Sequence, residues 1–167
     1  MRDIFFSICI PSFNQGQFIE KCILSCLNQS YKNFEILIVD NNSTDITKGI
    51  LEKYKDKITV KKIDNDGIIA KSRNLSLKDA KGDWIVLLDT DDYFSHDKLQ
   101  KVKDEILKDE FDVFCHSEWM SFSKGSFDEI WFYGNNKKDF YKDLIKYGNC
   151  LSASASVVKK SFLEKNS

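Results

Sequence analysis

Residues 82–92, GDWIVLLDTDD, join a short apolar run to an acidic turn. The apolar run is Trp84–Leu88, and Asp89, Asp91 and Asp92 follow it directly. An apolar run of this length that is bounded by turn residues predicts a strand buried on both faces. Such strands belong to parallel sheets covered by helices, whose ligands bind beyond the carboxyl ends of the strands. The acidic cluster is therefore expected at the ligand-binding edge of a sheet.

The three carboxylates of this turn have two interpretations. Crowded carboxylates repel one another unless a cation or a set of donors offsets their charge. Hard divalent cations prefer oxygen ligands, so Mg²⁺ or Mn²⁺ is the expected guest. The structural alternative is an acidic turn in which Asp92 or Ser95 caps the next helix. These residues alone leave both interpretations open.

Strands and helices alternate along the first two thirds of the chain. Apolar runs predict strands over residues 4–10, 34–39, 58–63 and 84–88, and helical apolar patterns follow from about Gln17, Thr44, Ile68 and Ser95. Strict alternation of this kind indicates a doubly wound α/β sheet, with residues 58–63 as an edge strand.

The pattern is less regular after Asp109. Residues 111–122 and 126–133 are predicted as strands of an antiparallel pair, 138–147 as a helix and 155–158 as a strand, with a last helix beginning at Lys160. No linker or repeat interrupts the sequence. We therefore expect one α/β domain over residues 1–167, with a mixed part after residue 110.

Composition excludes several classes of protein. The 167 residues are 42% hydrophobic and 31% charged, with a formal net charge of -1. A balanced charge argues against a nucleic-acid binder, which needs a basic excess. No apolar run reaches the length of a transmembrane helix, which predicts a soluble protein. The odd number of cysteines, and the absence of a metal-binding spacing among them, indicate a reducing compartment with buried free thiols (Cys9, Cys22, Cys26, Cys115 and Cys150).

Polar residues follow three of the predicted buried strands. Parallel strands end at the same edge of a sheet, so these groups are expected to share one crevice: Pro11, Ser12, Phe13 and Asn14; Asp40, Asn41 and Asn42; Asp89, Asp91 and Asp92. An aromatic ring, a carboxylate that accepts from a base and a metal site suit a nucleoside diphosphate. The chain has neither the dinucleotide fingerprint nor the P-loop, which favours a metal-held diphosphate. Phe13 as a core aromatic and Asp40 as a helix cap remain structural alternatives.

Three segments in order resemble the family 2 (GT-A fold) glycosyltransferases. They are SICIPSFN (7–14), FEILIVDNNSTD (34–45) and GIIAKSRNLSLKDAKGDWIVLLDTDD (67–92). The resemblance covers about residues 4–100 well and the remainder loosely. It implies a GT-A (Rossmann-like), mostly parallel sheet flanked by helices. Residues 1–110 would form the nucleotide-sugar-binding half, and residues 111–167 would begin an acceptor half that ends early.

The resemblance also implies roles for individual residues. Pro11, Ser12, Phe13 and Asn14 would line the nucleoside pocket, and Asp40 would accept a hydrogen bond from the base. Asp91 would hold Mg²⁺ or Mn²⁺ on the diphosphate, and Asp89 would contact the sugar nucleotide or the metal. Arg73 would meet phosphate or sugar oxygens, with a solvated helix face as its structural alternative. The catalytic base would lie beyond Ser167, and Asp128 and Glu129 are interpreted as surface residues.

The expected activity is transfer of a sugar from a nucleoside-diphosphate sugar to an acceptor hydroxyl. The resemblance implies a UDP-sugar donor, inversion at the anomeric carbon, and a saccharide or lipid-linked acceptor in cell-envelope or exopolysaccharide synthesis. The expected location is the cytoplasm, including the inner face of the membrane as a peripheral protein. Apolar surface near Phe162 and Leu163 would favour a homodimer.

Two other functions remain open at this point. One is a nucleotide-sugar-binding module that lacks catalysis because the base is absent. The other is an aspartyl phosphatase-like enzyme with Asp89 as the nucleophile, since a strand ending in Asp-x-Asp also suits that chemistry.

Overall fold

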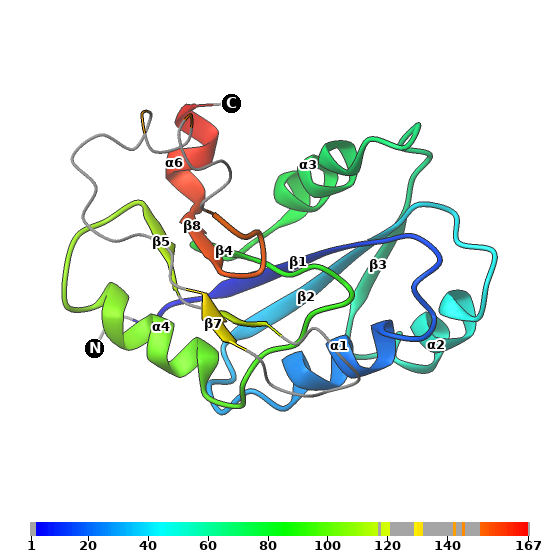
Figure 1. Ribbon diagram of the computed structural model, residues 1–167, viewed down its shortest axis with the longest axis horizontal. Coiled ribbons are helices and arrows are strands. Elements are labelled where there is room, and N and C mark those ends of the chain that lie inside the picture. Colours follow the sequence, from blue (N-terminus) through cyan, green and yellow to red (C-terminus); the bar gives the residue numbers. More distant parts are fainter. Residues whose placement is uncertain are drawn as a thin grey trace.

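The computed structural model describes residues 3–116, 118–120, 129–131, 142, 145 and 151–166. Its main feature is a six-stranded sheet with the order β3-β2-β1-β4-β8-β5 (Figure 1). Four strands run parallel, as predicted: β1 (Phe6–Ser12), β2 (Phe34–Asp40), β3 (Thr59–Lys62) and β4 (Trp84–Leu87). The strand β8 (Ser156–Lys159) pairs antiparallel with both β4 and β5 (Val113–Cys115). The α/β fold class and the edge position of β3 are thereby confirmed.

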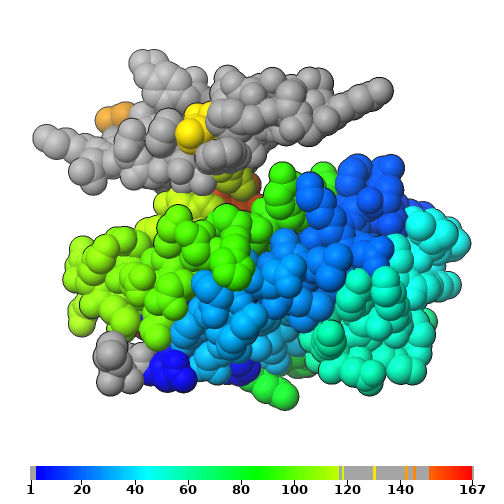
Figure 2. All heavy atoms as spheres, turned by 90° about the horizontal axis from the view of Figure 1, so that it is seen from below, coloured from blue at the N-terminus to red at the C-terminus, as the bar shows by residue number. Residues whose placement is uncertain are grey.

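Helices cover both faces of this sheet. The helices α1 (Ile19–Leu27), α2 (Thr47–Lys53) and α4 (Lys98–Ile106) lie on one face, and α3 (Ile69–Asp79) and α6 (Lys160–Lys165) lie on the other (Figure 1). The space-filling view from the first face shows α4 in green, α1 in blue and α2 in cyan beside one another (Figure 2). None of the described helices is both long and apolar enough to cross a membrane.

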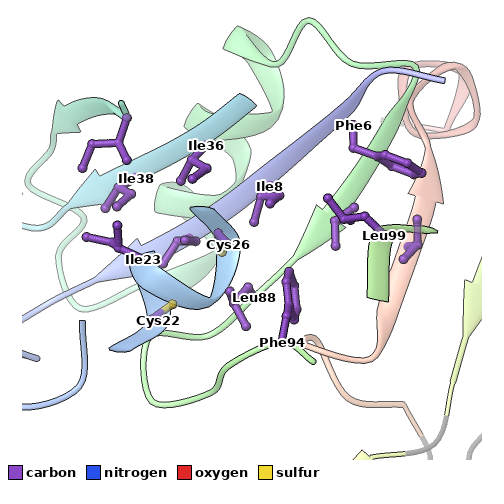
Figure 3. Packing of buried hydrophobic residues seen from close by; sticks show 14 of the residues in the cluster. Phe6, Ile8, Cys22, Ile23, Cys26, Ile36, Ile38, Leu88, Phe94 and Leu99 are labelled. Atoms are coloured by element: carbon purple, nitrogen blue, oxygen red, sulfur yellow. The ribbon is translucent and has the colours of Figure 1, made fainter. Parts of the chain in front are cut away.

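The alternation of side chains along β1 divides the core between the two faces. Phe6 and Ile8 are fully buried and pack with residues of α1, β2 and α4 in the larger cluster (Figure 3). Cys9 points to the other face and packs against residues of α3 and α6, including Leu163. Phe162, by contrast, is 37% exposed.

Three of the four described thiols belong to the core. Cys9, Cys22 and Cys26 are buried and free, and Cys115 is half-buried and free. Burial raises the pKa of the Cys9 thiol to about 12. The three buried thiols therefore act as small core residues, as the sequence predicts, whereas Cys115 is only half-buried.

The part after residue 110 differs from the prediction in one respect. The single strand predicted over residues 111–122 is two strands in different sheets, β5 and β6 (Glu118–Met120). The strand β6 pairs antiparallel with β7 (Glu129–Trp131), which confirms the predicted pair in a shorter form. The connection between them, with Asp128, lies outside the described residues. Of the helix predicted over 138–147, Lys142 and Ile145 are described, and both are helical.

Gly82, two residues before β4, lies directly against the backbone of β1. Its N–H donates to Ser7 Oγ at 2.8 Å, and a Cβ atom at this position would lie 2.5 Å from the backbone nitrogen of Ser7. No side chain fits there without displacing one strand from the other. The pairing of β4 beside β1 therefore requires glycine at this position.

We expect Gly82→Ala to destabilise the protein by about 1–3 kcal/mol, because the added methyl overpacks two backbones that cannot separate freely. Urea unfolding of the variant measures this loss. Gly49→Ala is the matched control, since a Cβ atom at this helical position meets nothing within 4 Å. The control should be neutral or more stable, because alanine favours a helix. Equal stability of Gly82→Ala and the wild type would contradict the close approach.

Candidate functional site

The carboxyl ends of β1, β2 and β4 open onto a single cavity of about 420 Å³. The three strands are neighbours, because β1 pairs with β2 on one side and with β4 on the other. The polar strand ends thus converge, as the sequence predicts. The lining residues are Pro11, Ser12, Phe13, Gln15, Asn41, Asn65, Gly67, Ile69, Ser72, Asp89, Thr90 and Asp91.

Phe13 lies at this cavity rather than in the core. Its side chain is 54% exposed, so the structural alternative of a core aromatic does not apply. Ser12 is buried beside it, and its hydroxyl has no hydrogen-bond partner among the described residues. An exposed ring and an unpartnered hydroxyl leave the end of β1 able to contact a ligand.

Asn14 belongs to the loop that supports the cavity. It has a positive φ of 50° and is absent from the cavity lining. Its side-chain oxygen accepts a hydrogen bond from the backbone N–H of Thr44 at 2.8 Å, and its own N–H donates to Ser43 Oγ at 2.9 Å. Asn14 therefore fastens the loop after β1 to the loop after β2.

Asp40 and Asn41 point in different directions at the end of β2. Asp40 is fully buried, and its carboxylate accepts hydrogen bonds from both the backbone N–H and the hydroxyl of Ser43. It holds the turn after β2 and does not line the cavity. Asn41, the next residue, does line it. The structure therefore places an amide, not the predicted carboxylate, at the point where β2 meets the cavity.

Asn41 and Asn65 form a pair that sequence reasoning missed. The N–H of Asn65 donates to the side-chain oxygen of Asn41 at 2.9 Å, which leaves the NH₂ group of Asn41 as its donor toward a ligand. Asn65 is itself held by Ser72 Oγ and by the N–H of Gly67, each at 2.9 Å. Asn65 follows β3, whose end the sequence presents only as a polar turn. The sequence did carry one signal for this pair, because an asparagine follows each of the adjacent strands β2 and β3.

Asp89 is held by an ion pair. Nη2 of Arg73, on α3, lies 2.6 Å from Oδ1 of Asp89, and the two side chains are 26% and 34% exposed. Nε of Arg73 is buried without a hydrogen-bond partner among the described residues. Arg73 is therefore not on a solvated helix face. The pair leaves Asp89 less available to a metal and keeps a cationic group beside the cavity.

The rest of the acidic turn is also fastened, with one exception. Thr90 Oγ1 donates to the carbonyl of Pro11 at 2.5 Å, and Asp92 Oδ2 accepts from Ser154 Oγ at 2.5 Å. Burial raises the pKa of the Asp92 carboxyl, and the negative charges of Asp91 and neighbouring acids add to this effect. Asp91 is exposed and lines the cavity, and among the three carboxylates of the turn it is the one without a hydrogen bond or ion pair within the described part of the chain.

Asp91 is the residue of the acidic turn that could hold a divalent cation. The described residues contain no group of three or more acidic, cysteine or histidine side chains that could enclose a metal ion. Mg²⁺ does not need such a cage, because it keeps several waters and takes one or two carboxylates together with substrate phosphates. An exposed, unpaired carboxylate beside two buried or paired ones fits that mode of binding. The helix-cap alternative for Asp92 does not apply, because its carboxylate binds Ser154.

The chain matches known proteins over nearly its whole length. The sequence profile described as Glycosyl transferase family 2 matches residues 7–164. An uncharacterised glycosyltransferase of Haemophilus influenzae is 33% identical over 162 residues, which cover 95% of this chain and 63% of that protein. The poly(ribitol-phosphate) beta-N-acetylglucosaminyltransferase TarS of Staphylococcus aureus is 35% identical over 100 residues, which cover 57% of this chain and 18% of TarS.

Solved structures agree with the sequence matches. The structure of S. aureus TarS 1-349 in complex with UDP has a TM-score of 0.79 and 26% identity, covering 98% of this chain and 49% of that one. A mannosyltransferase of Pyrobaculum calidifontis, solved with GDP-Man and Mn²⁺, shares the fold with a TM-score of 0.70 at 17% identity, covering 99% of this chain and 47% of that one. The chain thus spans only part of the proteins it matches. The GT-A fold is confirmed, and the chain belongs to glycosyltransferase family 2.

Proposed function

We propose that the cavity binds a nucleoside-diphosphate sugar and that the protein transfers the sugar to an acceptor hydroxyl. The observation that carries this proposal is the convergence of Phe13, Asn41 and Asp91 on one cavity at the ends of adjacent strands. The three side chains supply a stacking surface, an amide donor and a free carboxylate. TarS, with 26% identity over 98% of the chain, has been solved with UDP and with UDP-GlcNAc, which supports a uridine donor.

Each group would have one task in donor binding. The base would stack on Phe13 near Pro11 and Ser12, with Asn41 donating to one of its carbonyl oxygens. Asp91 would hold Mg²⁺ or Mn²⁺, which offsets the charge that develops on the diphosphate as it leaves. The guanidinium of Arg73 would meet a phosphate or sugar oxygen while its pair with Asp89 keeps it in place. Asp89 would thus contact the sugar nucleotide through this pair, and Asp91 alone would bind the metal.

The second half of the proposed reaction involves the acceptor hydroxyl and the base that activates it. We infer an inverting displacement, in which a carboxylate base outside residues 1–167 takes the proton of the attacking hydroxyl. The name of TarS, and its identity to this chain, favour a saccharide or polyol-phosphate polymer of the cell envelope as the acceptor. A cytoplasmic protein that works at the inner face of the membrane would meet such an acceptor. A homodimer through the exposed Phe162 remains a prediction.

The phosphatase-like alternative is not favoured by the site. A nucleophilic Asp89 would need an unpaired carboxylate, and this carboxylate lies 2.6 Å from Arg73. A binding module without catalysis would use the same donor cavity, and an assay of sugar transfer distinguishes the two.

Calorimetric titration of the chain with UDP, GDP and dTDP, each with and without Mn²⁺, tests the proposed function. We expect UDP to bind, and to bind more tightly with Mn²⁺ than without it. Magnesium chloride in place of manganese tests whether the ion is interchangeable. Failure of all three nucleotides to bind in the presence of metal would overturn the proposal.

Asn41→Ala should weaken UDP binding about tenfold, because the base loses a hydrogen-bond donor. The matched variant is Asp40→Asn, which changes the residue that the sequence alone favours as the contact to the base. We expect Asp40→Asn to lower the unfolding temperature, since the buried Asp40–Ser43 contacts are weakened, while UDP affinity stays within about twofold. Titration calorimetry and thermal unfolding separate the two effects. The reverse pattern would assign the base contact to Asp40.

A further inference from the structure

Ser154 lies against the acidic turn although it is far away in sequence. It precedes β8, the antiparallel strand that pairs with β4. The backbone N–H of Asp89 donates to Ser154 Oγ at 3.0 Å, and the same hydroxyl donates to Asp92 Oδ2 at 2.5 Å. One hydroxyl thus bridges the first and the last residue of the turn, and Ser154 itself is only 5% exposed.

The bridge closes a turn whose own backbone contact is a single hydrogen bond. The N–H of Asp92 donates to the carbonyl of Asp89 at 3.1 Å. Asp91 lies between the two bridged residues. The orientation of the Asp91 side chain therefore depends on how firmly Asp89 and Asp92 are held. Without the hydroxyl, the partly buried N–H of Asp89 and the partly buried carboxylate of Asp92 would each lose a partner.

A second contact fixes Ser154 itself. The side-chain nitrogen Nζ of Lys98, at the start of α4, donates a hydrogen bond to the carbonyl of Ser154 at 2.7 Å. Lys98 is 7% exposed, and its Nζ lies 3.7 Å from the centroid of the Phe94 ring. The backbone of Ser154 is therefore held from α4 while its side chain holds the acidic turn.

We propose that Ser154 is a positioning residue, which orients Asp91 toward the cavity by bridging Asp89 and Asp92. It touches neither the donor nor the metal and acts through the turn. This inference rests on the proposed function for its effect on donor binding, but not for its effect on the turn. Ser154 does not bond Asp91 directly, so we expect an effect at the lower end of the about 10–100-fold in metal affinity that a direct hydrogen-bond partner of a metal ligand contributes.

The test uses Ser154→Ala, with Ser152→Ala as the matched control. Ser152 lies in the same segment, but its hydroxyl donates to Glu118 Oε1 at 2.8 Å rather than to the acidic turn. Two quantities are measured: hydrogen exchange of the Asp89 amide in the free chain, and the ratio of UDP affinities with and without Mn²⁺. Ser154→Thr, which keeps the hydroxyl, serves as the conservative variant.

We expect Ser154→Ala to accelerate exchange of the Asp89 amide and to reduce the Mn²⁺ enhancement of UDP binding about tenfold. Ser154→Thr should retain most of the enhancement, and Ser152→Ala should match the wild type in both measurements. A purely structural role would lower the unfolding temperature without a selective change in the Mn²⁺ ratio. That result, or unchanged exchange at Asp89, would overturn the proposal.

The two measurements also separate this inference from the proposed function. If exchange accelerates in Ser154→Ala while the wild type fails to bind UDP with metal, the proposed function fails and the bridging role stands. If the wild type binds with metal and Ser154→Ala binds equally well, the proposed function stands and the positioning role is wrong.

Discussion

Asp91→Ala should abolish the Mn²⁺-dependent part of UDP binding, a loss of roughly 100-fold or more in affinity at saturating metal. Within the described residues, Asp91 is the one carboxylate of the acidic turn that faces the cavity without a protein partner. A cation that bridges protein and diphosphate through a single carboxylate loses its only fixed ligand when that side chain is removed. Residual binding should come from base stacking and from Arg73, and should no longer respond to Mn²⁺.

The stability of the variant should change little. Asp91 is exposed and unpaired, and its charge helps to raise the pKa of the neighbouring Asp92. Its removal relieves repulsion rather than breaking a contact. Titration calorimetry with and without Mn²⁺ gives the affinities, and thermal unfolding confirms the fold.

Asp66→Ala is a suitable control for Asp91→Ala. Asp66 is an exposed aspartate that precedes Gly67 of the cavity lining, so the change in net charge is the same, but its carboxylate pairs with Lys71. We expect the Asp66 variant to keep the full Mn²⁺ response. A Mn²⁺ response that survives in Asp91→Ala would mean that the ion binds elsewhere, with Asp89 as the next candidate once its pair with Arg73 opens.

The parallel part of the fold could be predicted because its signals are local. The strands β1, β2 and β4 are apolar runs bounded by turn residues, β3 shows the alternation of an edge strand, and each of the four is followed by a helical pattern. Convergence of the strand ends then follows from the geometry of parallel sheets. The division of residues 111–122 into β5 and β6 could not be predicted, because the aromatic run continues across the point where the chain leaves one sheet for another.

The candidate site was predictable to the level of the segment rather than the side chain. Neighbouring residues at a strand end point to opposite sides, so the sequence could favour Asp40 or Asn41 but could not decide between them. Burial decides it, since Asp40 is fully buried against Ser43 while Asn41 lines the cavity. Ser154 gave no local signal, because its role arises from a pairing between β4 and β8 that brings together residues more than 60 positions apart.

Lys98→Met should change how stability depends on pH, because Lys98 is a lysine buried inside the protein. Burial lowers the pKa of its ammonium group to about 7, and the negative charges of Glu118 and Asp92 offset only part of that cost. In the unfolded chain the group keeps its ordinary pKa of 10.5. Between these two values the unfolded state binds a proton that the folded state does not. The stability of the wild type therefore rises with pH in this window, and the methionine variant lacks the contribution.

The size of the effect follows from the shift. The wild type should gain about 3 kcal/mol in unfolding free energy relative to Lys98→Met between pH 7 and about pH 9.5, and the gain should vanish below pH 7, where both states carry the proton. Urea unfolding of both proteins across this range measures the difference, and thiols that titrate in both proteins cancel from it. Lys101→Met, which removes an exposed lysine from the same helix, controls for the loss of a positive charge.

Parallel stability curves for wild type and Lys98→Met would mean that Lys98 stays charged in the folded protein. The charge would then be stabilised by Ser154 O and the Phe94 ring, and the link from α4 to the acidic turn would be a charge-assisted hydrogen bond.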